Sequence, residues 1–457
     1  MKVYLLKIKP ILGVTLVLFF SPIKAESLSF LQAYQKSLTY DATLLAAENQ
    51  YDAQKEEIEK ANAAFLPQIR IVGTRGFAYT DSTSGTLRGT PVQRHSLYQT
   101  ENYSLQVRQP IFNWANFAAY DQAVARVEQG ESVLKVERLK LISRVTQSYL
   151  DLLNTVENIR YVSAQKKSVE QQLEMAERRF KSEVGTITEI HEAKTKLAEV
   201  QAQELDWNNH LDYAKRVLEN TIGEYPKQFF LLDPNKLKTD ALDGKPLSEW
   251  LDMASHNSPE LHAAESRLQV AYEEVEKNKA NHYPTVDLVG QKVYSSSDNT
   301  YTVGNVYDTN AVNIQVNVPV YLGGYVSASV RQAQAQYEQA RNLLDDVRRD
   351  LNVNVHDFYN DIQKGLGSIK AYEQAVISGE IALSGTISGF KAGFRSNVDV
   401  LNAEERLFNA KRLLSKERYG LINNRIQLKL SAGILSNEDV EEVNKCLTIP
   451  NFIEENG

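Results

Sequence analysis

Two segments of the chain alternate between apolar and polar residues. Residues 311–320 place valine or isoleucine at every even position and mostly polar residues at the odd positions. Residues 99–111 show the same period of two, which puts apolar side chains on one face of a β-strand and polar side chains on the other. With two partner segments that alternate less cleanly, we expect four strands, at about 67–80, 99–111, 284–294 and 311–320.

Long helical patterns occupy most of the remaining chain. Residues 115–180 contain no proline, so a continuous helix there would reach roughly 100 Å at 1.5 Å per residue. In the second half, apolar or small residues recur at alternating steps of four and three, as in a coiled-coil seam. They are Ala333, Tyr337, Ala340, Leu344, Val347 and Leu351. We expect the helices to reverse near residues 182–185 and 392–393, where glycine would permit a left-handed turn.

The chain also matches itself at an offset of about 210 residues, which indicates an internal duplication. Matched residues include Pro67 with Pro284, Pro110 with Pro319, and Gly223 with Gly433. Chance similarity between two helical stretches would not also align these prolines and glycines. We therefore expect a first structural repeat at 26–225, a linker and middle-belt segment at 226–246, a second repeat at 247–435 and a C-terminal tail at 436–457.

The N-terminus carries the pattern of a secretory signal peptide. Lysines precede an apolar run of residues 11–20, and Ala25 supplies a small residue before the expected cleavage site. That run is about half the roughly 20 residues that a membrane-spanning helix needs, although a short membrane anchor is the alternative to a signal peptide at 1–25. Beyond it, no apolar stretch approaches that length. The mature chain is therefore either soluble or enters a membrane as β-strands.

Composition and motifs exclude several classes of function. The chain has 51 basic and 58 acidic residues, a formal charge of −7, so we expect no nucleic-acid partner. Its single cysteine, Cys446, excludes an internal disulfide and a cysteine-cluster metal site. The seven histidines are scattered, and no dinucleotide, phosphate-loop or nucleophile-elbow motif occurs. We therefore expect no enzyme, with no catalytic, cofactor-binding or metal-binding residues.

A strand of about ten residues with one apolar face is typical of outer-membrane β-barrels, although a half-buried soluble sheet gives the same pattern. Aromatic residues at the strand ends resemble an interfacial belt, namely Phe112, Trp114, Phe117, Tyr321 and Tyr325. Four strands cannot close a barrel, because small barrels need about eight. If the strands form a barrel, several chains must contribute to it.

The element order, the duplication and the segment FKAGFRSNVDVLNAE at 390–404 resemble the TolC-type outer-membrane efflux and type I secretion channel family. The resemblance implies a mainly α fold with β: a duplicated α/β barrel whose long coiled-coil helices form an α-helical tunnel, with four strands per chain in a trimeric 12-stranded membrane β-barrel. It also implies a location in the outer membrane of a Gram-negative bacterium, with the tunnel extending into the periplasm.

The same resemblance implies partners and site residues. The partners are a homotrimer, outer-membrane lipid, a periplasmic adaptor and an inner-membrane transporter, which is either an ABC or a proton-driven protein. The family's periplasmic gate falls on Thr188, Glu189, Phe390 and Arg395, and its aperture ring on Asp399 and Asn402. Phe390 replaces the family's tyrosine and Asn402 its second acid, but an ion pair between Arg395 and Glu189 is still expected.

Two questions stay open at the level of sequence. A non-conducting coiled-coil tether of the cell envelope would also need long heptad helices, and it is the alternative to a channel. Within the channel interpretation, the cargo is either a secreted protein or small drugs, because the channel contacts whatever its partners deliver.

Overall fold

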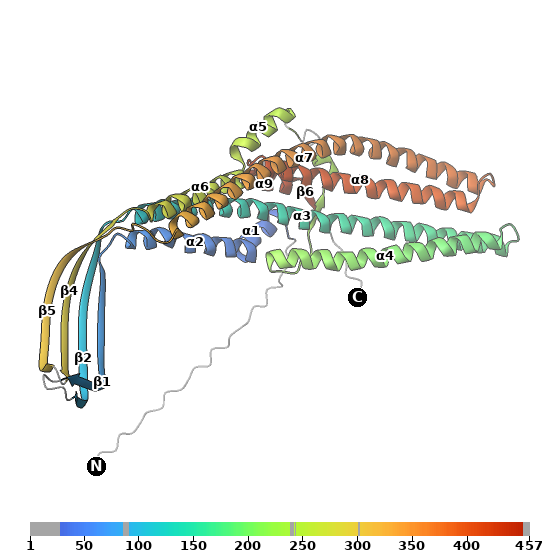
Figure 1. Cartoon of the computed structure of the whole chain (residues 1–457). Coiled ribbons are helices and arrows are strands. Elements are labelled where there is room, and N and C mark those ends of the chain that lie inside the picture. The colour runs from blue at the N-terminus through green and yellow to red at the C-terminus, as the bar shows by residue number, and fades with distance from the viewer. Residues whose placement is uncertain (1–27, 86–90, 238–241, 243, 300–301, 451–457) are drawn as a thin grey trace, which may run out of the picture.

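The computed structural model describes residues 28–85, 91–237, 242, 244–299 and 302–450. The expected signal peptide at 1–25 lies outside the described residues. Long helices run side by side through most of the molecule, and four strands leave one end of the helical part (Figure 1). None of the helices in the described ranges combines the length and the apolar character that a bilayer-spanning helix requires.

Each half is built around one long helix: α3 (Trp114–Lys181, 68 residues) in the first half and α7 (Tyr325–Lys391, 67 residues) in the second. Four shorter helices lie along them: α2 (Ala42–Ala63), α4 (Ile187–Ile222), α6 (Pro259–Ala280) and α8 (Asn397–Ser431). α3 contacts all four, and α7 contacts α6 and α8. The long continuous helix expected at 115–180 is α3, and its counterpart in the second repeat is α7.

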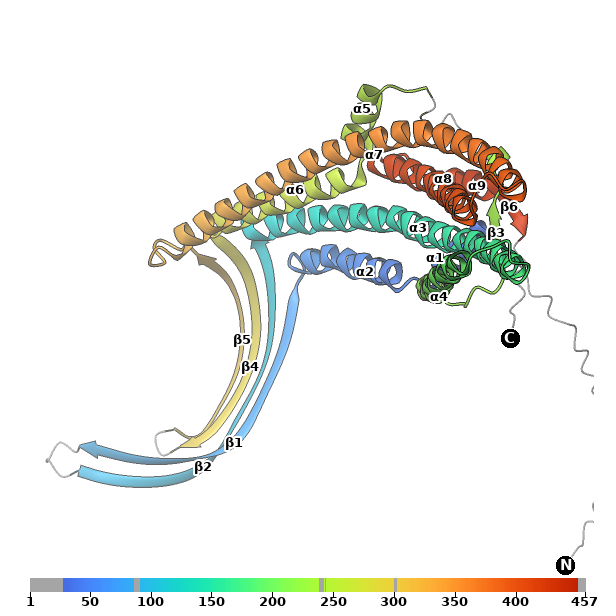
Figure 2. The ribbon, with the colours of Figure 1, turned by 90° about the vertical axis from the view of Figure 1, so that its right-hand side faces the viewer.

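In each half, two shorter helices meet end to end beside the long ones (Figures 1 and 2). α4 ends at Gly223, whose added Cβ would lie 2.6 Å from the Tyr40 ring just before α2. α8 ends near Gly433, whose added Cβ would lie 2.1 Å from the Asn257 carbonyl oxygen just before α6. Both glycines have positive φ angles, 76° and 69°. The aligned glycines of the duplication therefore mark equivalent helix junctions.

The expected linker and tail form one small folded unit. It contains α1 (Phe30–Tyr40), β3 (Phe230–Leu232), the 3-10 helix η1 (Pro234–Lys236), α9 (Asn437–Cys446) and β6 (Leu447–Pro450). β3 pairs antiparallel with β6. Tyr149 of α3 anchors this unit, because its hydroxyl donates to the Leu28 carbonyl at 2.9 Å and accepts from the Phe230 N–H at 3.3 Å. A further helix, α5 (Leu247–Asn257), packs on α7.

One antiparallel sheet contains the four long strands, in the order β1-β2-β4-β5. They are β1 (Gln68–Gly85), β2 (Pro91–Phe112), β4 (Thr285–Asn299) and β5 (Thr302–Asn317). Each repeat contributes one hairpin, and β2 and β4 join the two hairpins. The outer strands β1 and β5 each have one edge without a strand partner among the described residues.

The strand limits differ from those expected. The expected strands at 67–80, 99–111 and 284–294 continue beyond those bounds into polar segments, because backbone pairing does not require an apolar side-chain pattern. The expected strand at 311–320 begins at Thr302 and ends at Asn317. It stops there because Pro319 has no N–H to donate to a ladder.

The sheet is curved (Figure 2), and the strand register gives it two chemically distinct faces. The cross-strand register places nine mainly apolar positions together on what we call the apolar face: Ile69, Ile71, Tyr103, Leu105, Val107, Leu288, Val312, Ile314 and Val316. Val312 is 76% exposed in the single chain. The opposite face, called the polar face, carries mainly amides and hydroxyls, such as those of Ser104, Gln106 and Asn313.

The helix junctions generate a stability prediction with an internal control. Gly393 has a φ of 79° but open space around an added Cβ, so Gly393→Ala should cost about 1–2 kcal/mol of backbone strain. Gly433→Ala should cost roughly 1–3 kcal/mol more, because the new methyl group overlaps the Asn257 carbonyl. Thermal unfolding of the two variants in detergent measures this difference. Equal unfolding midpoints would show that the junction tolerates a side chain.

Candidate functional site at the hairpin tips

Two helical hairpins end close together, at the end of the molecule farthest from the strands (Figure 1). α3 and α4 reverse at residues 182–186, and α7 and α8 reverse at 392–396. Gly393 adopts the expected positive φ, but in the first turn the residue with positive φ is Glu183, at 57°. Gly185 instead allows the turn to pass close to α3, because its added Cβ would lie 2.9 Å from the Cβ of Arg179.

One guanidinium group connects the two tips. The Arg179 guanidinium carbon lies 4.8 Å from the centroid of the Phe390 ring, which is 2% exposed. On the same side chain, Nε lies 4.0 Å from Oε2 of Glu189 at the start of α4. Arg179 therefore makes a cation–π contact with the second hairpin and an ion pair within the first. Sequence reasoning missed Arg179.

The structure separates the residues expected to pair. Among the described residues of the single chain, Arg395 and Glu189 form no ion pair, because the nearest cation to this carboxylate is that of Arg179. Arg395 is exposed and packs its side chain over Gly389. Thr188 is exposed on the first turn of α4. Asn402 is exposed on α8, and its carbonyl oxygen accepts from Nε of Arg406 at 3.2 Å.

Asp399 caps the helix on which it lies. Its Oδ2 accepts from the backbone N–H and the hydroxyl of Ser396, both at 2.9 Å, while the Asp399 N–H donates to the Ser396 hydroxyl at 3.1 Å. The hydrogen bonds from Ser396 lower the pKa of Asp399 below its ordinary value, with a smaller contribution from nearby arginines. Asp399 therefore keeps its negative charge even in mildly acidic solution.

A buried polar seam joins α3 to α8 behind the tips. Glu404 is 1% exposed and accepts a hydrogen bond from the Ser168 hydroxyl. Its Oε2, and the amide oxygens of Gln165 and Gln172, have no hydrogen-bond partner among the described residues. Burial raises the pKa of Glu404 above that of an ordinary glutamate, and hydrogen bonds offset this only in part. The Glu404 carboxyl therefore holds its proton to a higher pH than an exposed one.

Within the first hairpin the helices meet through apolar side chains rather than polar ones. Val162 and Val169 of α3 pack on Ala193 and Val200 of α4, all at most 1% exposed. By contrast, Gln165, Gln172 and Arg179 recur seven residues apart in the same helix. That spacing was the available signal for a polar seam. Since the buried amide oxygens there lack partners among the described residues, this polar stretch between the hairpins is weaker than the apolar contact within a hairpin.

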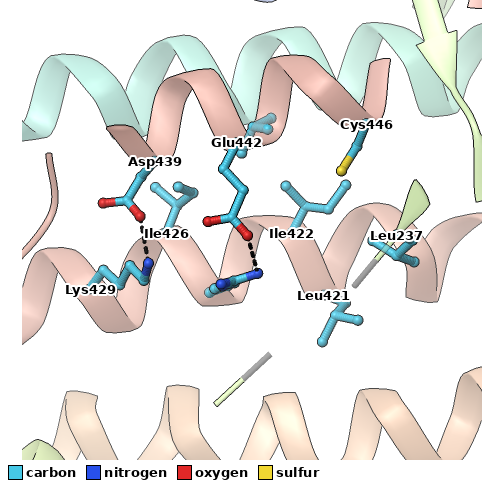
Figure 3. Close-up of a pocket in the computed structure, with 10 residues that line it drawn as sticks. Leu237, Leu421, Ile422, Ile426, Lys429, Asp439, Glu442 and Cys446 are labelled. Carbon is cyan, nitrogen blue, oxygen red and sulfur yellow. Dashed lines mark hydrogen bonds and ion pairs between the residues drawn. The ribbon is translucent and has the colours of Figure 1, made fainter. Parts of the chain in front are cut away.

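A separate cavity lies far from the tips, between α8 and α9 (Figure 3). It is partly open to solvent and has apolar walls that include Leu237, Ile422 and Ile426. Across one side, Lys429 pairs with Asp439, and Arg425 pairs with Glu442 at 3.0 Å. These ion pairs hold α9 against α8. Within the described ranges, no group of three or more His, Cys, Asp or Glu residues could hold a metal ion.

Comparison with known proteins gives consistent matches over most of the chain. The family model for outer membrane efflux proteins matches residues 33–224 and 250–434. The proteases secretion protein PrtF of Dickeya chrysanthemi is 30% identical over 434 residues, covering 94% of this chain and 93% of that protein. The alkaline protease secretion protein AprF of Pseudomonas aeruginosa is 31% identical over 423 residues, covering 92% and 87%.

The solved structures agree on the fold. A crystal structure of CusC, which forms a transmembrane channel, superposes with a TM-score of 0.75 at 18% identity, covering 89% of this chain and 92% of that one. The expected fold class, long helices with a few strands in the TolC-like arrangement, is thereby confirmed.

The buried carboxyl of Glu404 predicts a pH-dependent stability. Because its pKa is higher in the folded than in the unfolded chain, the folded state binds more protons. The unfolding free energy should therefore fall as pH rises from the ordinary glutamate pKa to the folded value, by at most about 1.4 kcal/mol per pH unit. Glu404→Gln should remove this fall. The stability of the variant relative to the unsubstituted protein should therefore be highest above the folded pKa of Glu404. Thermal unfolding between pH 4 and 8 measures both proteins.

The matched control is the neighbouring residue Glu405, an exposed carboxylate 2.9 Å from Lys196. Glu405→Gln removes an ion pair and should leave the decline with pH in place. If the profiles of the unsubstituted protein and Glu404→Gln run parallel over the whole range, Glu404 has no raised pKa in the folded protein.

Proposed function

The chain belongs to the outer membrane efflux protein family, and from this premise we propose that it is an outer-membrane channel that exports proteins by type I secretion. The observation that carries the proposal is the open, two-faced sheet at one end of a long helical hairpin structure. A non-conducting tether has no need of strands with one apolar and one polar face.

The free strand edges argue for a closed trimer. In lipid, every backbone N–H and C=O group needs a partner, so β1 and β5 cannot face hydrocarbon unpaired. If β5 of one chain pairs with β1 of the next, three chains close a barrel of about 12 strands. The apolar face then contacts lipid and the polar face lines the bore.

Two groups of aromatic residues set the depth of this barrel in the bilayer. Tyr103 and Tyr294 stack at 6.2 Å across β2 and β4, while Trp114 packs on Tyr283 at 6.1 Å where the strands meet the helices. The strand length between these belts, about 30 Å at 3.3 Å per residue, gives a band roughly 25 Å tall when strands tilt by about 40°. Outer-membrane barrels have such a band with an aromatic belt at each interface.

The helices then extend into the periplasm as a tunnel, and partners supply the energy. The hairpin of α7 and α8 continues for roughly 50 Å beyond the helix junctions. The sequence has no nucleotide-binding motif. A periplasmic adaptor and an inner-membrane transporter at the hairpin tips therefore drive export. Protein cargo favours an ABC transporter over a proton-driven one, and the names of PrtF and AprF support such cargo.

We assign the periplasmic gate to the hairpin tips. Thr188, Glu189, Phe390 and Arg395 hold the closed state, together with Arg179, and Asp399 and Asn402 form the aperture ring. The support is that the Arg179 contacts join the two hairpins, while the exposed Arg395 is free to reach a neighbouring chain. Because the seam between hairpins is polar around Gln165, Gln172 and Glu404, a shift of the hairpin of α7 and α8 there would separate less apolar surface than a shift within a hairpin.

The function is tested by reconstitution and by secretion. The purified trimer should conduct in a planar bilayer, and deleting its gene should abolish secretion of the protein exported by the partner ABC transporter. Absence of conductance from a folded trimer would favour a tether. Drug sensitivity with normal protein secretion would instead assign it to drug efflux.

The position of the lipid band predicts the effect of buried charge. Val312 lies midway between the two aromatic belts, whereas Val316 lies level with Phe112, close to the belt where the strands meet the helices. Val312→Lys should therefore impair assembly by about 2–4 kcal/mol, and Val316→Lys should have a smaller effect. Asn313→Lys, on the polar face, is the control and should assemble normally. Assembly is measured as the fraction of heat-resistant trimer; the reverse pattern would mean that the two faces are inverted.

The gate assignment predicts that the gate and the aperture ring control different electrical properties of the channel. Arg395→Ser should raise resting conductance, since a bias of roughly 1–3 kcal/mol shifts a two-state equilibrium about 5- to 150-fold. Asp399→Asn should lower cation selectivity without opening the pore, and Asn402→Asp should raise that selectivity by adding a second ring of carboxylates. Single-channel recording measures both quantities. Unchanged conductance in the first variant and unchanged selectivity in the other two would leave these residues as ordinary surface charges.

A further inference from the structure

The polar face of the sheet carries few charges, and they are clustered. Among the residues whose side chains the structure describes, its charged members are Arg70, Arg108 and Asp287. All other positions on this face whose side chains the structure describes are uncharged. The three residues lie near the ends of their strands that join the helices.

One of these arginines is neutralised and the other is not. Nη2 of Arg108 lies 2.7 Å from Oδ2 of Asp287, whose side chain is 6% exposed. Arg70 is exposed, and no carboxylate lies within ion-pair distance of it among the described residues. Arg70 pairs with Gln106 and Arg108 with Gln68 across β1 and β2. The two arginines are therefore diagonal neighbours, about 7–8 Å apart.

In a closed trimer, this arrangement becomes a ring. A 12-stranded barrel with strands about 4.8 Å apart and tilted by about 40° has a radius of roughly 12 Å. Arginine side chains that extend inward bring their guanidinium groups within a Debye length of the axis, about 8 Å at physiological ionic strength. Three unpaired copies of Arg70 therefore act on the whole cross-section of the bore.

We propose that Arg70, positioned beside the Arg108–Asp287 pair, forms a cationic ring at the periplasmic end of the barrel that binds carboxylate groups of the exported chain. The guanidinium group suits this role because its planar fork donates two parallel hydrogen bonds to one carboxylate. The inference rests on the proposed function, since it needs the trimeric channel. It adds a cargo preference for acidic segments.

The ring of Arg70 lies at the opposite end of the pathway from the hairpin tips. An acidic segment that reaches the barrel is attracted to the ring and is therefore retained on the barrel side. Neutral or basic segments gain nothing at the ring.

The test uses the full-length trimer in a planar bilayer, with a short poly-glutamate peptide added to the barrel side as the probe. The peptide should block the current in the unsubstituted channel, more weakly as salt concentration rises. Arg70→Gln should weaken the block about 10- to 100-fold, the factor expected for losing charge-assisted hydrogen bonds. Arg70→Lys, which keeps the charge, should retain most of the block.

Arg75→Gln is the matched control. Arg75 lies on the same strand but on the apolar face, where its Nε is 3.1 Å from Glu101, so its loss should leave the block unchanged. A poly-glutamine peptide of the same length should not block any variant. If no channel conducts, the proposed channel function fails. If all variants conduct and poly-glutamate blocks the Arg70→Gln channel as tightly as the Arg75→Gln channel, the proposed cationic ring is wrong.

Discussion

A peptide group that enters lipid must have its hydrogen bonds satisfied within protein, and this chain cannot meet that requirement alone. Among the described residues, its sheet ends in two edges without a strand partner, β1 and β5, while the inner strands β2 and β4 pair with each other. The duplication explains the asymmetry, because each repeat brings one hairpin and the two hairpins join through inner strands. Closure then has to come from identical chains, and the three-fold arrangement sets the geometry of everything attached to the sheet.

The helices extend that arrangement away from the membrane with two kinds of contact. Apolar seams such as that of Val162 and Val169 with α4 keep each hairpin rigid. Behind the tips, the seam between hairpins includes a polar stretch that contains the buried Glu404. Breaking an apolar seam exposes hydrocarbon to water, whereas separating a polar seam returns groups to water that were incompletely paired. The fold thus combines rigid hairpins with a weaker, partly polar boundary between them.

Sequence reasoning predicted what depends on periodic pattern. Four strands, two long helices and the repeat followed from alternation, heptad spacing and aligned glycines such as Gly223 and Gly433. It could not predict the full strand lengths, since ladder hydrogen bonds extend through segments without side-chain pattern. Nor could it predict the pairing of β3 with β6, three- and four-residue strands more than 200 residues apart. Arg179 was missed because its partners come from two different helices.

The duplication also explains how one local motif takes two roles. Glu189 and Asp399 occupy equivalent positions, each three residues after a hydroxyl residue that caps its helix. In the second hairpin the Asp399 carboxylate returns to Ser396, which keeps it ionised and close to the helix end. In the first, the Glu189 carboxylate turns to Arg179 and so to the other hairpin. Two equivalent acids therefore diverge: Asp399 caps its own helix, and Glu189 pairs with the arginine that contacts the other hairpin.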